Sequence, residues 1–219
     1  MRRLVVNTFM TLDGVMQAPG GPEEDTTGGF KYGGWIFHYG DEMTRKTLDE
    51  FMSKTFELLL GRKTYEIFAA YWPYIKDDTI ADKFNQTKKY VASRTLKKLN
   101  WDNSLVIKSD VVNEIDKIKK QAGPELQVYG SSNLIKTLFN GNIIDLFKIW
   151  IYPVTVGKGK QLFGEGTNAS NLKLVDVKTS STGVIIATYE PAGELKLGSL
   201  ALEDPSEAEL ERRRKFADE

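Results

Sequence analysis

One glycine stands where an expected strand meets a helix that opens with positive charge and a hydroxyl group. The segment LLLGRKTYE ends an apolar run, 56–60, at Gly61 and continues as Arg62, Lys63 and Thr64. A helix that begins at such a turn has unpaired backbone N–H groups, and these groups and the helix dipole attract anions. The segment therefore predicts a phosphate site, although a glycine in this position is more often only a turn.

A second turn of the same kind follows the apolar run 126–129. It consists of Gly130, Ser131, Ser132 and Asn133, whose small side chains let a ligand approach the backbone. Two such turns in one chain favour a site that holds the two ends of a pyrophosphate. A third expected strand ends at Ser93-Arg94, a pair that can hold a phosphomonoester but that, taken alone, is better explained as a surface arginine.

Alternating strand and helix patterns are expected to carry these turns. They predict one α/β domain with a mixed, mostly parallel central sheet, flanking helices and a C-terminal antiparallel hairpin. The expected strands are 4–9, 56–60, 90–93, 104–108, 126–129, 145–156, 172–178 and 184–189, and the expected helices are 41–52, 62–68, 79–86, 111–121 and 134–139.

The long loop 17–40 is rich in glycine and aromatic residues. Loops of this length in compact domains are often lids or binding loops, and the aromatic rings argue against a disordered excursion. Trp35 is a candidate to cover a substrate ring, or else packs the loop onto the core. His38 can in principle donate a proton, but a lone loop histidine is usually structural or solvated.

Composition excludes several classes of function. Among 219 residues, 30 Lys and Arg balance 30 Asp and Glu, so no excess charge favours nucleic acid or an anionic membrane. With no cysteine and one histidine, thiol catalysis and multi-His or Cys-based metal sites are not expected. The Rossmann, P-loop and hydrolase-elbow motifs are absent. We expect no metal, no signal peptide or membrane span, and a cytoplasmic location.

The composition changes at residue 191. Residues 1–190 are expected to form the domain, and 191–219 a charged tail that is helical where Ser206 and Glu209 fit a capping box. A solvated helix, an appended extension and a partner-docking segment all remain open for this tail.

Five segments in succession resemble the dihydrofolate-reductase-like superfamily. The similarity is strongest to the reductase domain of the riboflavin-biosynthesis deaminase-reductase and its stand-alone bacterial relatives, and it spans about residues 2–190. It implies a single-domain dihydrofolate-reductase-like fold and an NADPH-dependent reductase. The segments are LVVNTFMTLDG, LLLGRKTYE, YVASRTL, LQVYGSSNLIKTLF and IYPVTVGKGKQLF.

The resemblance also implies roles for individual residues. For the cofactor, it implies that the Gly61 turn holds phosphates, that Ser93 and Arg94 lie beside the adenosine 2′-phosphate, and that 130–132 cover the pyrophosphate and nicotinamide ribose. This chain has Gly-Ser-Ser where many relatives have consecutive glycines. On the substrate side it implies the turn 11–14, with Asp13 as the catalytic candidate, and the segment 161–165. The full set of expected substrate-binding residues is Thr11, Asp13, Trp35, Leu162, Phe163 and Glu165.

The predicted activity is hydride transfer from NADPH to a small heterocyclic or imine substrate that is pyrimidine- or pterin-like. A catalytically silent NADPH-binding or scaffold protein is one alternative. True dihydrofolate reductase is another, although the resemblance implies a buried carboxylate on the helix before Gly61, where this chain has Arg45 and Lys46. The apolar strand 145–156 predicts a homodimer through that part of the sheet, and the resemblance implies the same, because relatives commonly form dimers.

Overall fold

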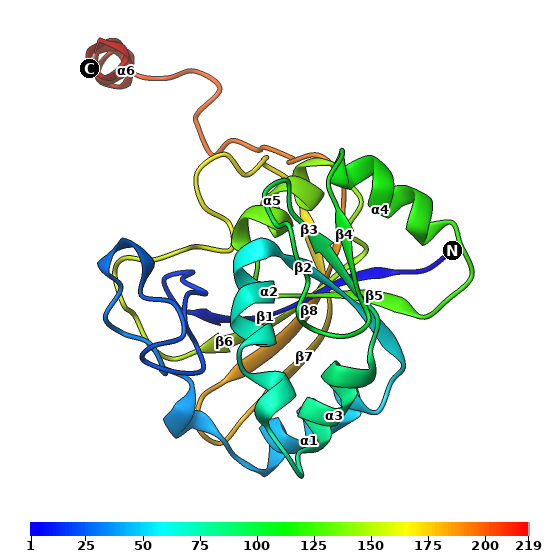
Figure 1. Cartoon of the computed structure of the whole chain (residues 1–219). Helices are drawn as coiled ribbons and strands as arrows, with labels where there is room; N and C mark the ends of the chain where they lie inside the picture. Colours follow the sequence, from blue (N-terminus) through cyan, green and yellow to red (C-terminus); the bar gives the residue numbers. More distant parts are fainter. Residues whose placement is uncertain (219) are drawn as a thin grey trace.

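The computed structural model describes residues 1–218, which form one α/β domain and a C-terminal extension (Figure 1). The domain is built on one eight-stranded sheet with the strand order β4-β3-β2-β5-β1-β6-β8-β7. The strands are β1 (Leu4–Thr11), β2 (Phe56–Gly61), β3 (Lys89–Ala92), β4 (Ser104–Ile107), β5 (Glu125–Tyr129), β6 (Leu146–Tyr152), β7 (Leu172–Thr179) and β8 (Ile185–Pro191).

The first six strands in this order, from β4 at the edge to β6, pair in parallel. The last two pairs, β6 with β8 and β8 with β7, are antiparallel. The predicted mixed sheet with a C-terminal antiparallel hairpin is therefore confirmed. The strand predicted over 145–156 is shorter than expected. It ends at Tyr152, just before Pro153, which has no N–H to donate to a ladder.

Helices cover both faces of the sheet (Figure 1). The helices are α1 (Glu42–Met52), α2 (Arg62–Ala69), α3 (Thr79–Gln86), α4 (Val111–Lys119), α5 (Ser132–Asn140) and α6 (Glu207–Ala217). Helices α1, α2 and α3 pack on the face that carries Leu58 and Trp150, and α4 and α5 pack on the face that carries Leu59 and Val128. Successive strand residues point to opposite faces, which is why adjacent leucines belong to different cores.

Strand β6 lies inside the sheet between β1 and β8. Phe147, Ile149, Trp150 and Tyr152 are each 5% exposed or less, because helices and neighbouring strands of the same chain cover them. This strand therefore does not present the free apolar surface to a second subunit that was predicted from the sequence.

The C-terminal extension leaves the domain after β8 and ends in α6, which stands apart from the rest of the chain (Figure 1). No residue of α6 is buried. Within residues 1–218, no helix combines the length and the apolar character needed to cross a bilayer.

Candidate active site

A large cleft of about 1920 Å³ opens at the carboxyl ends of the parallel strands. Ligands of open α/β sheets bind at this edge, because strand-to-helix turns converge there. The turns after β2, β3, β4 and β5 all contribute to the lining, together with the central residues of β1. The cleft has a polar half formed by these turns, which we call the phosphate half, and an apolar half described below.

The β2–α2 turn supplies one wall of the phosphate half. Gly61 precedes α2 in an extended conformation, and no side chain caps the helix N-terminus. Lys63 is exposed and lines the cleft, whereas the Arg62 guanidinium donates to the Glu66 carboxylate at 2.8 Å. Free N–H groups, the helix dipole and a lysine that has no ion-pair partner among residues 1–218 make this turn suited to an anion.

The β5–α5 turn faces the β2–α2 turn and is fastened to it. Ser131 has a left-handed backbone (φ 61°), and its Oγ accepts from the Gly61 N–H at 2.9 Å and lies 2.9 Å from Thr64 Oγ1. Gly130 has φ +54°, and a Cβ there would lie 3.1 Å from Thr64 Oγ1. A side chain at Gly130 would thus be both strained and crowded, so the two turns fix each other in place.

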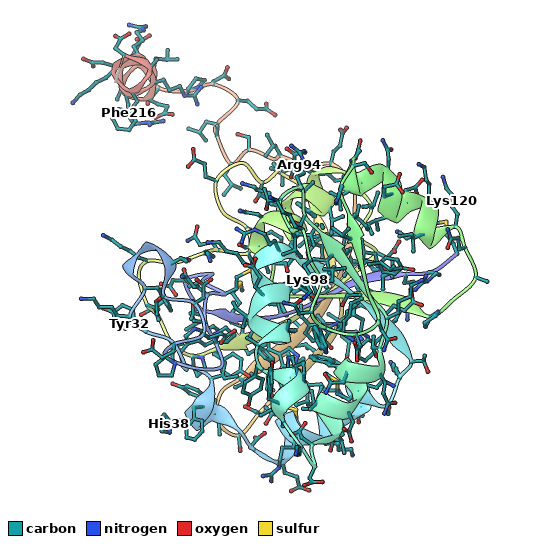
Figure 2. The ribbon with its side chains drawn as sticks, in the orientation of Figure 1. Tyr32, His38, Arg94, Lys98, Lys120 and Phe216 are labelled. Carbon is teal, nitrogen blue, oxygen red and sulfur yellow. The ribbon has the colours of Figure 1, made fainter. Side chains whose placement is uncertain are left out.

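Ser93 and Arg94 line the cleft at the end of β3, as the sequence predicted for their position. The Ser93 Oγ accepts from the N–H groups of Thr95 and Leu96 at 3.2 and 3.0 Å, and so it shapes the turn that presents Arg94. Figure 2 shows the Arg94 side chain at the surface of the domain. A neighbouring turn, Ser109–Val111 before α4, also lines the cleft and was not predicted from the sequence, although Asp110 at the helix N-cap is a signal for it.

The other half of the cleft is lined by aromatic and aliphatic side chains, and we call it the ring half. Its lining includes Phe9 of β1, Leu48 and Phe51 of α1, Trp72 and Trp150. The ring of Trp150 lies edge-on to Phe9 at 5.5 Å and to Phe51 at 6.1 Å between centroids. Such a surface favours a planar ring over a charged group.

The first part of the long loop, 17–27, also lines the cleft, together with Met16 before it and Ile36. The loop is held by its own hydrogen bonds, in which the Gln17 side-chain amide donates to the carbonyls of Asp25 and Thr27. The Asp25 carboxylate also pairs with Lys160, and burial raises the pKa of Glu24. The loop is thus an organised wall of the cleft.

The structure does not bring Thr11 and Asp13 to the lining of the cleft. The Asp13 carboxylate accepts from the Thr11 hydroxyl at 2.5 Å and from the N–H groups of Val156 and Gly157 at 3.1 and 2.6 Å. These bonds lower its pKa, the Thr11 hydroxyl most of all. Asp13 therefore ties the turn after β1 to the loop after β6, and its catalytic role stays an untested prediction.

The remaining expected substrate residues also lie outside the lining of this cleft. The Trp35 indole N–H donates to the Gln17 carbonyl at 2.9 Å, and its ring packs on Tyr152, so it anchors the loop. Leu162 is 1% exposed in the core, and Phe163 packs edge-on to Phe139. Leu162 and Glu165 line a separate hollow of about 210 Å³. Figure 2 shows His38 at the outer surface of the loop.

The fold and the arrangement of these turns agree with comparisons to known proteins. The RibD C-terminal domain family matches residues 2–186 of the sequence. The chain belongs to this family. The resemblance seen in the sequence is thereby confirmed. Among curated relatives of this RibD C-terminal domain chain, the uncharacterized protein YyaP of Bacillus subtilis (strain 168) is 30% identical over 192 residues, covering 86% of this chain and 94% of YyaP.

Solved structures share the fold of this RibD C-terminal domain. A putative riboflavin biosynthesis protein from Shewanella sp. PV-4 superposes with a TM-score of 0.66 at 17% identity, covering 87% of this chain and 99% of the other. A dihydrofolate reductase from Enterococcus faecalis complexed with NADP(H) gives 0.53 at 14% identity, covering 86% and 96%. The predicted dihydrofolate-reductase-like fold is confirmed.

Proposed function

We propose that this RibD C-terminal domain is an NADPH-dependent reductase that transfers a hydride to a planar heterocyclic or imine substrate. The observation that carries the proposal is one large cleft, in which a phosphate half built from strand-to-helix turns is continuous with an aromatic ring half. A dinucleotide needs phosphate sites at one end and room for a flat ring at the other. NADPH, when bound, would supply the hydride.

The residues present fit a dinucleotide phosphate group. The turns at Gly61 and Gly130 leave two helix N-termini without side-chain caps, and a Cβ at Gly130 would crowd Thr64. Lys63 and Arg94 add positive charge to the same half of the cleft. These residues would bind and orient the phosphates, while Phe9, Phe51 and Trp150 would exclude water from the reacting rings.

The lining of α1 bears on the kind of reductase. Leu48 and Phe51 are the α1 residues that line the cleft, and both are apolar. The pterin-pairing carboxylate that the resemblance implies for dihydrofolate reductase therefore has no counterpart on this helix. We favour a substrate other than dihydrofolate.

Titration of the protein with NADPH and NADH, followed by loss of NADPH absorbance against a panel of pyrimidines, pterins and cyclic imines, tests the proposal. Lys63→Glu places negative charge at the common phosphates and is expected to weaken both cofactors by at least roughly tenfold. The matched control is Lys98→Glu, an exposed lysine outside the cleft lining, which should bind both cofactors as the wild type does.

Three outcomes separate the alternatives. Failure of the wild type to bind NADPH would overturn the proposal. Tight NADPH binding with no turnover of any substrate class would instead support the catalytically silent binding protein. Equal losses in the Lys63 and Lys98 variants would show that the turn after β2 is not the phosphate site.

A further inference from the structure

Asn7, in the middle of β1, is a buried polar residue that lines the cleft and has no hydrogen-bond partner. Its exposure is 4%, and neither Oδ1 nor Nδ2 contacts a donor or acceptor in the described part of the chain. Buried side-chain polar atoms in folded proteins are nearly always hydrogen-bonded. An unmet donor and an unmet acceptor at a cleft wall therefore point to a ligand.

The neighbours of Asn7 on the same sheet face are engaged elsewhere. Its register partners are Tyr129 on β5 and Lys148 on β6. The Tyr129 hydroxyl donates to Gln127 Oε1 at 2.9 Å, and the Lys148 ammonium lies 4.3 Å from the centroid of the Phe51 ring. Asn7 is thus outside the polar network of the sheet, so its amide is not explained by the core.

The chemistry of the amide defines its complement. A primary amide presents one acceptor and one donor side by side, whichever way it is turned, and the matching ligand edge has an adjacent N–H and C=O. The surrounding ring half is apolar, with Phe9 and Trp150 among its walls, so this polar edge must belong to an otherwise flat, uncharged group.

We propose that Asn7 is a specificity-determining residue that pairs with an amide edge of the bound ligand. The edge is the C=O and N–H of a lactam ring in the substrate, or the carboxamide of the nicotinamide. The inference rests on the proposed function, because that function places both rings in this half of the cleft.

The first test is the stability of the free protein. Asn7→Leu keeps the branched heavy-atom skeleton of the side chain and removes both unmet polar atoms, so it should melt at or above the wild-type temperature. The matched control is Asn85→Leu, because Asn85 donates to the Trp72 carbonyl and accepts from the Trp101 indole at 3.0 and 2.7 Å. That variant should melt clearly lower. A loss for Asn7→Leu equal to that of Asn85→Leu would assign Asn7 to the core and overturn the proposal.

The second test is a pair of ligand comparisons, read as binding constants. NADPH is compared with its 3-acetylpyridine analogue, which lacks the amide N–H, and lumazine with 1,3-dimethyllumazine, which lacks the ring N–H, the latter pair in the presence of NADP⁺. We expect the wild type to prefer the N–H-bearing partner of one pair by roughly tenfold, and Asn7→Leu to lose that preference. The pair affected identifies the cofactor or the substrate ring as the source of the edge.

The outcomes distinguish this inference from the proposed function. If Asn7→Leu keeps the wild-type preferences, or if the wild type binds all four ligands without preference, the role of Asn7 is refuted while the reductase proposal stands. If the wild type binds neither NADPH nor lumazine, the proposed function fails and the role of Asn7 fails with it.

Discussion

Arg94 is the residue on which we expect cofactor choice to depend in this cleft. Its guanidinium has no ion-pair or hydrogen-bond partner within residues 1–218, whereas Arg62 is already paired with Glu66. The Ser93 hydroxyl stabilises the turn that carries this arginine at the end of a strand. The guanidinium thus keeps both of its parallel N–H donors free for a phosphomonoester. NADPH and NADH differ by such a group at the adenosine 2′ position.

Replacing Arg94 by Ala is expected to weaken NADPH binding by about ten- to a hundredfold and to leave NADH binding nearly unchanged. A charge-assisted hydrogen bond contributes about 1.5–3 kcal/mol, and NADH has no phosphate to use it. Calorimetric titration of the wild type and the variant with each cofactor measures the difference. Equal losses for both cofactors, or no loss for either, would remove Arg94 from the 2′-phosphate site.

Residues whose place in the cleft depends on a local turn could be predicted from the sequence, and residues whose place depends on tertiary contacts could not. Gly61 and 130–132 were expected at the cleft because strand-to-helix turns carry their own signal in glycine and hydroxyl residues, whereas Ser93-Arg94 was expected there on the resemblance. Asn7 was missed because a single polar residue within an apolar strand does not indicate a binding site until the position of the cleft is known. Asp13 was assigned to the cleft on resemblance, but in the structure its carboxylate accepts hydrogen bonds from the backbone N–H groups of Val156 and Gly157, which are distant in sequence.

At the scale of the elements, Asp41 links helix α1 to the β7–β8 hairpin. One carboxylate oxygen caps the helix by accepting from the Thr44 N–H, and the other accepts from the N–H and hydroxyl of Ser181, each at 2.8 Å. These bonds lower the pKa of Asp41 from 3.8 to about 2, with the Thr44 N–H as the largest cause. α1 carries Leu48 and Phe51, so this link helps to position a wall of the ring half.

The link is expected to weaken in acid. Because the pKa of Asp41 is lower in the folded than in the unfolded chain, its stabilisation is complete above about pH 4 and is lost as the pH falls through about 2. The free energy of unfolding of the wild type should therefore fall more steeply over this range than that of Asp41→Asn, measured by urea titration. Asp77→Asn, at an exposed aspartate, is the control and should keep the wild-type slope.

The loop 17–40 was predicted to be a lid, and its two parts are placed differently. Residues 16–27 line the cleft, whereas most of 28–40 packs away from it, with Phe30 buried against Val15 and Ala18. Tyr32 and His38 lie at the outer surface of this second part (Figure 2). A ligand in the cleft would therefore contact the first part of the loop.

Amide hydrogen exchange in 16–27 should slow when NADPH and a substrate analogue bind, because contact with ligand suppresses local opening. Exchange in 28–34 should change much less and serves as the internal control. Slowing spread evenly over both parts would indicate that the whole loop closes as one body. Unchanged exchange in 16–27 would show that the loop is a fixed wall and not a lid.

At the scale of the whole molecule, the order of strands and helices was readable from the sequence, but the edges of the sheet were not. Periodicity identified the segments, and the Gly61 signal marked a helix start. The position of a strand within the sheet depends on long-range pairing, and hydrophobic periodicity does not predict such pairing. The apolar run 145–156 was therefore read as a free surface, although β6 is an interior strand with β8 and β7 beyond it.

A row of exposed apolar side chains lies instead on β7, the edge strand at that end of the sheet. Leu174, Val175 and Val177 are 48%, 54% and 49% exposed, and Ile185 of the adjacent β8 is 37% exposed. An edge strand with unpaired backbone groups and apolar side chains is a template for pairing with another chain. Lys173, Lys178 and the irregular register between Leu174 and Asp176 limit such pairing but leave the centre of the strand apolar.

The predicted homodimer is therefore expected to form through β7. Light scattering at micromolar concentration should give about twice the chain mass of 24.7 kDa. Val175→Lys with Val177→Lys should give the monomer mass with a near-wild-type circular dichroism spectrum, because both side chains are exposed in the single chain and their charges would meet only across a dimer. The control is a second pair of lysine substitutions at exposed residues of α6, which should leave the mass unchanged. Leu210 is not used for this control because it is partly buried. A monomer mass for the wild type would refute the dimer, and a dimer that survives the β7 substitutions would place its interface elsewhere.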